Sequence, residues 1–262
     1  MDAVSFNRCA KSAVGRVDTR LFVFDNSPVP CCNPEELNEM GMVYLSDTSN
    51  PGVSHAYNAA AGYARDNGYD WLLLLDQDTD FKDENYLDYC IKTISDNSNS
   101  EAIAPCVYVN NELFSPQKGL VWPKKGNYII GGYNSIKNAS IINSGLLVKV
   151  DTFFSVGGYN ENVPLDLADH QFMYRLGKNG VKFYLMNFEL FQSFSNNVDN
   201  FESLKFRFNS LTIGCLNFEA DFLMRLKVYV LMTKRCFSLT SRYNTFAFIK
   251  ILLKNICKRI RK

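Results

Sequence analysis

The stretch WLLLLDQD, residues 71–78, decides the fold, because an unbroken apolar run ends abruptly in two acids. Leu72 to Leu75 do not alternate with polar residues, as they would in a strand with one solvent-exposed face. A short apolar run bounded by polar residues is typical of a strand that is covered on both sides, as in a parallel sheet between helices. Acids directly after such a strand lie at the edge where open α/β sheets bind ligands. We therefore predict a buried strand that places Asp76 and Asp78 at a ligand site.

The composition of the 262 residues limits the class of protein. Hydrophobic residues make up 47% and charged residues 21%, as in a protein with a substantial core, and a net charge of +1 gives no general attraction for nucleic acid. The 8 cysteines show no C-x-x-C spacing, which argues against a zinc site and favours free thiols in a reducing compartment. The first residues lack a hydrophobic signal core, and no apolar run reaches the ~20 residues that cross a bilayer. We expect a cytoplasmic location, at or near the inner face of the cell membrane.

Strand and helix patterns alternate along most of the chain. Strands are predicted at 20–25, 42–45, 71–75, 102–109, 141–150 and 181–186, and helices at 4–15, 53–66, 83–95 and 166–179. Alternation of this kind predicts an α/β fold with a mostly parallel central sheet and helices on both faces. Residues 110–140 read as an irregular excursion, and the chain beyond about 200 becomes helical and basic. We predict a catalytic domain at 1–200 and a helical extension at 201–262.

Acidic residues cluster at three predicted strand ends or the loops that follow them: Asp25, the pair Asp76 and Asp78, and the pair Asp166 and Asp169. Two carboxylates one residue apart can share a hard divalent cation, Mg²⁺ or Mn²⁺, whose remaining ligands are often phosphates. Such a cation neutralises a diphosphate leaving group. Asp25 can accept hydrogen bonds from a base or ribose. Acids in these positions also serve as ordinary turn residues and helix caps, and both readings stay open.

A resemblance adds to this reading. The chain resembles the family-2 glycosyltransferases, most closely the bacterial rhamnosyltransferase-like branch, over roughly residues 17–195. The segments that carry the resemblance are, in order, Phe24–Ser27, Asn50–Val53 with Asn58, Leu73–Asp78, Asn143–Gly145, Val156–Tyr159 and Leu165–Phe172 with Arg175.

The resemblance implies a GT-A fold and a nucleotide-diphospho-sugar donor. By position, Asp25 would contact the nucleoside, Asp76 the ribose and Asp78 the metal, with Asp76 as a second metal ligand. The other donor-site positions implied are Asn50, Gly52 and Asn58 beside the donor, and Ser144 and Gly145 on the sugar or acceptor side.

Asp169 matches the family position of the general base. An inverting transfer needs a carboxylate near the acceptor hydroxyl to take its proton during attack. Asp166 would share a helix face with Asp169, three residues later, and Asp169 ranks first because His170 and an amphipathic segment follow it. Arg175 is expected to brace the acidic helix by an ion pair.

The chain departs from the family in two places. Relatives begin with a strand that lies between those ending at Asp25 and Asp76, and this sequence starts at about the helix that follows it. Its absence would leave backbone groups of both neighbours unpaired. Relatives also carry a histidine after the last strand, where Gln192 stands here, and glutamine is a poorer metal ligand than imidazole.

Residues 246–262 form a basic amphipathic segment. On a helix the isoleucines and leucines at 249, 252, 253, 256 and 260 gather on one side, and Lys250, Lys254, Lys258 and Arg261 on another. This pattern fits peripheral contact with an anionic membrane, and equally a helix packed on the catalytic domain with a solvated cationic face.

Taken together, these features predict an inverting glycosyltransferase that moves a sugar from a nucleotide-diphosphate donor to a glycan or lipid-linked glycan. The resemblance makes rhamnose the leading donor sugar and bacterial surface polysaccharide (O-antigen or capsule) the expected product. The alternative is a catalytically weakened or inactive sugar-nucleotide-binding or scaffold protein. A nucleotidyltransferase is a weaker alternative, because no Gly-rich, basic phosphate loop is present.

Overall fold

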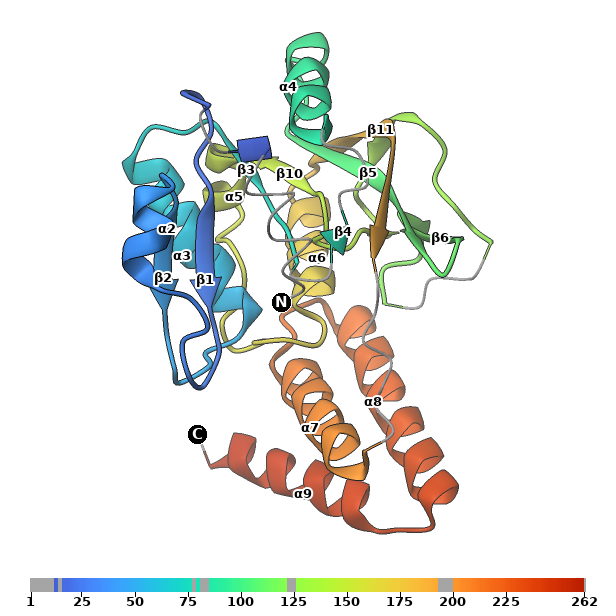
Figure 1. Cartoon of the computed structure of the whole chain (residues 1–262). Coiled ribbons are helices and arrows are strands. Elements are labelled where there is room, and N and C mark those ends of the chain that lie inside the picture. The colour runs from blue at the N-terminus through green and yellow to red at the C-terminus, as the bar shows by residue number, and fades with distance from the viewer. Residues whose placement is uncertain are drawn as a thin grey trace.

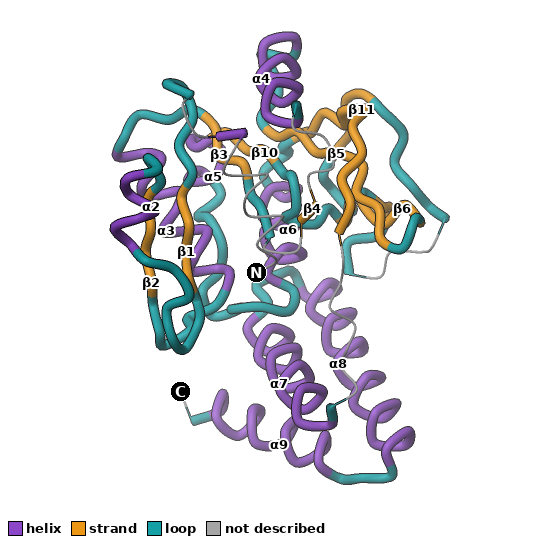
Figure 2. Tube along the Cα trace, viewed as in Figure 1, coloured by secondary structure: helices purple, strands orange, loops and turns teal. Residues whose placement is uncertain are grey.

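The computed structural model of the chain describes residues 12–13, 16–76, 79–80, 85–121, 126–192 and 200–261. They form a mixed α/β part and, below it in Figures 1 and 2, a group of three helices. Most predicted strands and helices are present near the expected positions, but the strand predicted at 141–150 covers only 147–149, and the strand predicted at 181–186 extends from 182 to 192. The helix predicted at 4–15 lies largely outside the described residues. Two short helices were not predicted, α2 (Pro34–Glu39) and α5 (Val150–Ser155).

The strands belong to one large and two small sheets. The large sheet has the order β3 (Trp71–Leu73), β10 (Leu147–Lys149), β5 (Ala102–Val109), β11 (Lys182–Gln192) and β4 (Thr79–Asp80), with β6 (Glu112–Ser115) on β5 and β8 (Gly132–Ser135) on β11. The small sheets pair β1 (Phe22–Asp25) with β2 (Val43–Ser46), and β7 (Gln117–Lys118) with β9 (Ala139–Ser140).

The prediction of a mostly parallel sheet was wrong in its pairing, although the α/β class is confirmed. β1–β2 and β5–β11 are parallel, but β10 runs antiparallel to both β3 and β5, and β4, β6 and β8 are antiparallel to their neighbours. The described part of residues 110–140 forms short antiparallel strands and no helix. The chain therefore enters β10 without the crossover helix that a parallel connection requires.

Helices cover both faces of the large sheet, because alternate side chains of its strands point to opposite sides. Ala102 and Ala104 of β5 join the main core with α3 (Val53–Asp66), α5 and α6 (Ala168–Lys178). Ile103 between them joins a second core on the other face, with Tyr86 and Cys90 of α4 (Tyr86–Asp96).

The last three helices are α7 (Phe201–Asn217), α8 (Phe222–Tyr243) and α9 (Ala247–Ile260), coloured orange to red in Figure 1. Cys215 of α7 and Val228 and Met232 of α8 belong to the main core. The division near residue 200 is thus crossed by shared packing, and two separate domains stay a prediction. Among the described residues, no helix has both the length and the apolar character needed to cross a bilayer.

A large hollow separates β1 from β3. Among the described residues, no strand pairs with the second edge of either β1 or β3. These two strands, together with α3, line a hollow of about 1840 Å³. Trp71, Leu72 and Leu73 are half-buried. Leu72 packs against the main core, and Trp71 and Leu73 pack against the second core, so both faces of the strand are covered as predicted and the hollow lies along its unpaired edge.

Candidate functional site

Acids from three distant segments line the hollow between β1 and β3. Asp25 ends β1, Asp76 follows β3, and Asp166 and Asp169 lie just before and within the first turn of α6. One hollow is thus lined by acids that lie more than a hundred positions apart in the chain. Asp78 lies outside the described residues, so its predicted role as metal ligand stays a prediction.

Asp25 is buried and heavily hydrogen-bonded. Its Oδ1 accepts the backbone N–H of Ser27 at 2.8 Å, while Oδ2 accepts the N–H of Cys31 at 2.9 Å and the hydroxyl of Tyr44 at 2.7 Å. Burial alone would raise the pKa of this carboxyl, but the hydrogen bonds from Ser27, Tyr44 and Cys31 hold it well below its usual value. Asp25 is therefore a fixed anion that holds the turn after β1 and faces the hollow.

Asp76 is oriented by two hydroxyl groups. Tyr57 of α3 donates to Oδ1 at 2.6 Å, and Ser144 donates to Oδ2 at 3.0 Å. The backbone N–H of Asp76 is 3.1 Å from Thr79 Oγ1. The carboxylate thus has a set orientation at the floor of the hollow.

The described residues do not by themselves make a metal site. Among them, no three histidine, cysteine, aspartate or glutamate side chains are grouped so that they could hold an ion. Asp76 offers one carboxylate, and a hard cation needs several oxygen ligands. Gln192 lines the same hollow and is buried, with an amide in the place where the family carries imidazole.

Asp169 is paired with its neighbour His170. Its Oδ1 accepts the backbone N–H of His170 at 2.7 Å and lies 2.6 Å from the ring Nδ1. Burial alone would raise the pKa of Asp169, but the His170 charge and these hydrogen bonds lower it. Burial alone would lower the pKa of His170, but Asp169 raises it. Both side chains are about one-fifth exposed, which leaves Asp169 accessible from the hollow.

Asp166 has a different environment, made by α7. Its Oδ2 is buried and has no hydrogen-bond partner among the described residues. Burial raises the pKa of Asp166, although Ser210 and the charge of Arg207, both on α7, act to lower it. Both α7 residues also line the hollow. The extension after residue 200 therefore contributes polar side chains to the site.

The loop before α3 is held against the segment that leads to α6. Gly52 has a φ of 95°, and a Cβ there would lie 2.3 Å from the carbonyl oxygen of Pro164. Ser54 donates to the carbonyl of Val163 at 2.6 Å. Asn50 and Gly52 both line the hollow. Close backbone contact therefore joins the predicted donor loop to the segment that carries Asp166 and Asp169.

Three predicted donor-site residues do not line the hollow. Asn58 donates to the carbonyl of Tyr159 at 3.0 Å and to Glu161 at 2.9 Å, and its Oδ1 accepts the N–H of Tyr159 at 2.9 Å. Ser144 is buried behind Asp76. Gly145 has a φ of 81°, and a Cβ there would collide with Leu190 at 2.4 Å. Their placement indicates positioning of the site, and direct donor contact stays a prediction.

Among the lining residues that were given no role from the sequence are Tyr57, Asn143, Arg207 and Ser210. Asn143 belongs to a quoted motif, and its Oδ1 accepts the Tyr159 hydroxyl at 2.6 Å. Tyr57 lies one residue before Asn58 on α3, a spacing that could have drawn attention to it. Arg207 and Ser210 had no signal, because the fold alone brings α7 beside α6.

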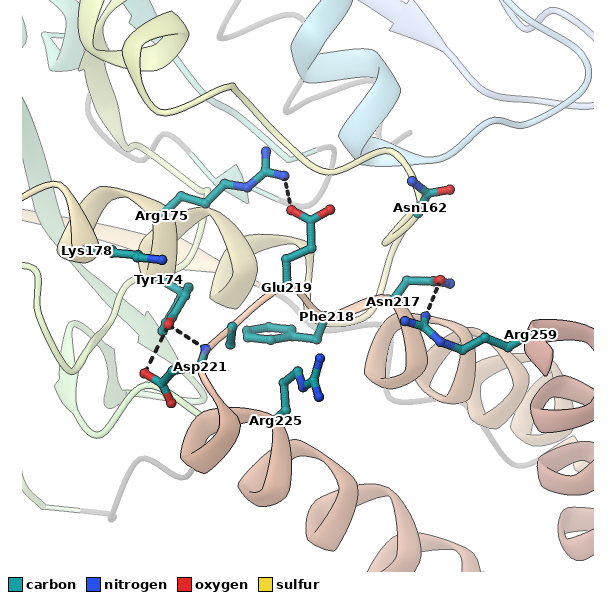
Figure 3. A pocket seen from close by; sticks show the side chains of 11 residues that line it. Asn162, Tyr174, Arg175, Lys178, Asn217, Phe218, Glu219, Asp221, Arg225 and Arg259 are labelled. Carbon is teal, nitrogen blue, oxygen red and sulfur yellow. Dashed lines mark hydrogen bonds and ion pairs between the residues drawn. The ribbon is translucent and has the colours of Figure 1, made fainter. Parts of the chain in front are cut away.

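A second pocket of about 510 Å³ lies where α6 meets the turn between α7 and α8 (Figure 3). Arg175 crosses it to Glu219 at 2.6 Å and also donates to the carbonyls of Gly157 and Gly158. The prediction that Arg175 forms a bracing ion pair is confirmed, with a partner beyond its own helix. Arg225 of α8 lines this pocket as well.

Comparisons with known proteins identify the fold through structure alone. No protein-family model matches the chain, and no curated protein sequence does. Solved structures of TarS from S. aureus superpose on 92% of this chain. The 1–349 fragment gives a TM-score of 0.55 at 14% sequence identity, and the same fragment in complex with UDP gives a TM-score of 0.53 at 15% sequence identity. The longer TarS structure gives a TM-score of 0.54 at 14% sequence identity.

The chain spans 41% of that longer TarS chain and 68–69% of the two fragments. At this identity the likeness concerns architecture. The central mixed sheet with its flanking helices is therefore the GT-A glycosyltransferase fold.

Proposed function

We propose that this protein transfers a sugar from a nucleotide-diphosphate donor to a hydroxyl of a glycan or lipid-linked glycan, with inversion at the sugar carbon. The observation that carries the proposal is the meeting of Asp25, Asp76 and Asp169 in one hollow of a GT-A fold. The UDP complex of the TarS fragment supports a nucleotide-linked donor. Rhamnose as the sugar, and surface polysaccharide as the product, rest on the sequence resemblance.

Three polar groups of the hollow contact the donor in this proposal. Asp25, a fixed anion beside β1, accepts hydrogen bonds from the nucleoside. Asp76, held by Tyr57 and Ser144, faces the ribose. Arg207 supplies a cation to a lining rich in acids, and a cation near a diphosphate stabilises the charge that develops as it departs.

Asp169 is the proposed general base. As the acceptor oxygen attacks the anomeric carbon, its proton passes to a carboxylate oxygen of Asp169, and the bond to the diphosphate breaks on the opposite side. Oδ1 is engaged by His170, so Oδ2 is the oxygen with room for this proton. Asp166 is the second candidate for the same role, because burial raises its pKa and its Oδ2 has no hydrogen-bond partner in the part of the chain that the structure describes.

A divalent cation, Mg²⁺ or Mn²⁺, remains part of the proposal through Asp76 and Asp78. When bound, it would neutralise charge on the donor diphosphate. Titration calorimetry with Mn²⁺ and UDP, alone and together, tests this part. Tighter UDP binding in Mn²⁺, lost in Asp78→Asn, supports it, while unchanged binding in both cases contradicts it.

The decisive experiment compares donor binding with transfer in Asp169→Asn. We expect transfer to fall by about 10²–10⁴-fold, because a general base contributes that much. Donor binding should be retained, since the isosteric amide leaves the hollow intact. Full transfer in this variant removes Asp169 as the base and points to Asp166→Asn as the next test.

An inactive sugar-nucleotide-binding protein is the alternative. The lowered pKa of Asp169 favours it, because a weaker base takes a proton less readily. Assays of donor hydrolysis and of transfer, with a panel of nucleotide sugars and bacterial glycan acceptors, separate the two. Binding of a nucleotide sugar with no turnover across the panel supports the alternative.

A further inference from the structure

The charge of the chain is divided sharply at residue 221. Residues 222–262 contain 11 lysines and arginines and no aspartate or glutamate, while residues 1–221 contain 17 basic and 27 acidic residues. The near-neutral chain is thus a part of net charge −10 joined to a segment of +11. That segment comprises α8 and α9.

The outward face of α8 is apolar as well as basic. One side of the helix packs inward through Val228, Met232, Cys236 and Leu239. The opposite side exposes Leu223 (68%), Leu226 (49%), Val230 (36%) and Phe237 (63%), and Phe222 (72%) lies at its start. Spacings of three, four and seven residues place Leu223, Leu226, Val230 and Phe237 along one stripe.

Lysines accompany this stripe. Lys227 and Lys234 are exposed and lie one residue after Leu226 and four residues after Val230, so they flank the apolar side chains on the helix surface. We call Phe222, Leu223, Leu226, Val230 and Phe237, with Lys227 and Lys234, the outer face of α8. Figure 1 shows α8 at the periphery of the helical group.

α9 does not offer a comparable apolar surface. Leu252 and Ile256 pack against the main core, and Phe248 is fully buried among α7 and α8. Leu253 and Ile260 remain exposed beside Lys250, Lys254 and Arg261. Most of the apolar side predicted for residues 246–262 is therefore covered by the protein itself, as in the packed-helix reading of that segment.

We propose that the outer face of α8 binds the surface of a bilayer that contains anionic lipids. An amphipathic helix that lies in a membrane interface combines large apolar side chains with lysines and arginines and lacks acids, as α8 does. The cations of α8 and α9 are complementary to negative lipid headgroups. Apolar side chains would enter the acyl boundary, while the lysine stems reach back to the phosphates.

The charges argue against a second copy of the chain as the occupant. Two copies joined through this face would bring the cations of two α8 helices together, and neither α8 nor α9 contains an acid. Lysine is depleted at protein interfaces, and like charges repel there. A nucleic acid would satisfy the cations but leave the exposed leucines and phenylalanines without apolar contact.

The test is flotation of the full chain with vesicles of phosphatidylcholine alone, or with 30% phosphatidylglycerol. We expect binding to the anionic vesicles that weakens with salt, and little binding to the neutral ones. The triple variant Phe222→Ser, Leu223→Ser, Phe237→Ser should lower the partition coefficient by at least about tenfold, because it removes the apolar part of the face. Lys227→Gln with Lys234→Gln should lower it by a similar factor.

Matched controls use side chains of equal kind on the α/β part. Val29→Ser, Ile130→Ser and Phe114→Ser remove exposed apolar groups there, and Lys137→Gln with Lys182→Gln removes two exposed lysines. These variants should bind vesicles like the parent chain, and all should retain its circular dichroism and melting temperature.

Three outcomes overturn the proposal. They are absence of binding to anionic vesicles, equal binding by the triple variant, and equal loss in the control variants. A parent chain that is dimeric by light scattering and becomes monomeric in the triple variant assigns the face to a second copy instead. Vesicle binding does not depend on turnover, so its failure is distinct from failure of the proposed transfer.

Discussion

Asp166 and Asp169 are three residues apart and line the same hollow, yet the pKa values of their carboxyl groups are shifted in opposite directions. Burial beside α7 raises the pKa of Asp166, whereas His170 lowers the pKa of Asp169. α6 begins at Ala168, so Asp166 lies before the helix and not on a shared helical face as predicted. Two acids with diverging pKa values in one cleft can hold different protonation states at the same pH.

The first prediction concerns stability against pH. The raised pKa of Asp166 means that the folded chain binds its proton more tightly, so this group stabilises the fold below the unfolded value of about 3.8 and loses that effect as pH rises through its folded pKa. Asp166→Asn should therefore be more stable than the parent at pH 7, with a smaller gain at pH 4. Urea unfolding across this range measures the difference. Asp96→Asn, at an exposed acid of α4, is the control for the loss of one carboxyl group.

The second prediction is that the ion pair of Asp169 and His170 stabilises the fold only between a lower and an upper pH limit. Because the pKa of Asp169 is lowered, this group stabilises the fold above about pH 3.8, and the stabilisation is lost as pH falls further. Because the pKa of His170 is raised, this group stabilises the fold below about pH 6.5, and the stabilisation is lost as pH rises through the pKa of the folded state. The parent should lose stability as pH rises above about 6.5, and His170→Gln should remove that decline. Identical stability profiles of the two proteins over this range would contradict the pair.

A third prediction tests the orientation of Asp76 by Tyr57. Tyr57→Phe removes a 2.6 Å hydrogen bond to the carboxylate, and a hydrogen bond to a charged group contributes about 1.5–3 kcal/mol. We expect UDP affinity to fall by about tenfold with the fold retained, as measured by titration calorimetry. Tyr63→Phe is the matched control, because Tyr63 lies on the same helix, lines the same hollow and stacks on Tyr69. Equal losses in the two variants would show that Asp76 is not what the change affects.

The fourth prediction separates two roles for Asn58. As a clamp on Tyr159 and Glu161, it should contribute to stability, and Asn58→Ala should cost about 1–3 kcal/mol, because it leaves backbone groups of Tyr159 without their partner. UDP affinity should change little. His55 lies on the same helix as Asn58 and makes a half-exposed contact with Glu161, so His55→Ala should cost less than about 1 kcal/mol. A stable Asn58→Ala protein with weakened UDP binding would instead favour donor contact.

A fifth prediction concerns the contact of α7 with the catalytic segment. A Cβ at Gly214 would lie 2.4 Å from the carbonyl oxygen of Asp166. Gly214→Ala should therefore destabilise the protein by about 1–3 kcal/mol through overpacking and should lower transfer. Gly62→Ala on α3, with open space around its Cβ, should be neutral or stabilising by up to about 1 kcal/mol. If Gly214→Ala leaves stability and transfer unchanged, the extension folds apart from the site.

The elements with strong local patterns were predictable. α3 spans Val53–Asp66 and β5 spans Ala102–Val109, as their residue patterns indicated. The antiparallel pairing of β10 was not predictable, because the direction of this strand depends on the path of residues 110–140, which carry no periodic pattern. The short helices α2 and α5 each span only six residues, too few for a helical period to stand out.

The sequence by itself determined the α/β class, the strand ends that carry Asp25 and Asp76, and the acids at the start of α6, because side-chain periodicity and turn chemistry are local properties. Only the tertiary structure decided what these residues meet. The hydroxyl of Tyr57 orients the carboxylate of Asp76. His170 lowers the pKa of Asp169, whereas burial beside α7 raises the pKa of Asp166. Most of the apolar side of α9 is packed against the rest of the protein, while α8 exposes one apolar side. Burial and hydrogen bonding depend on segments brought together by folding, and no local pattern in the chain records them.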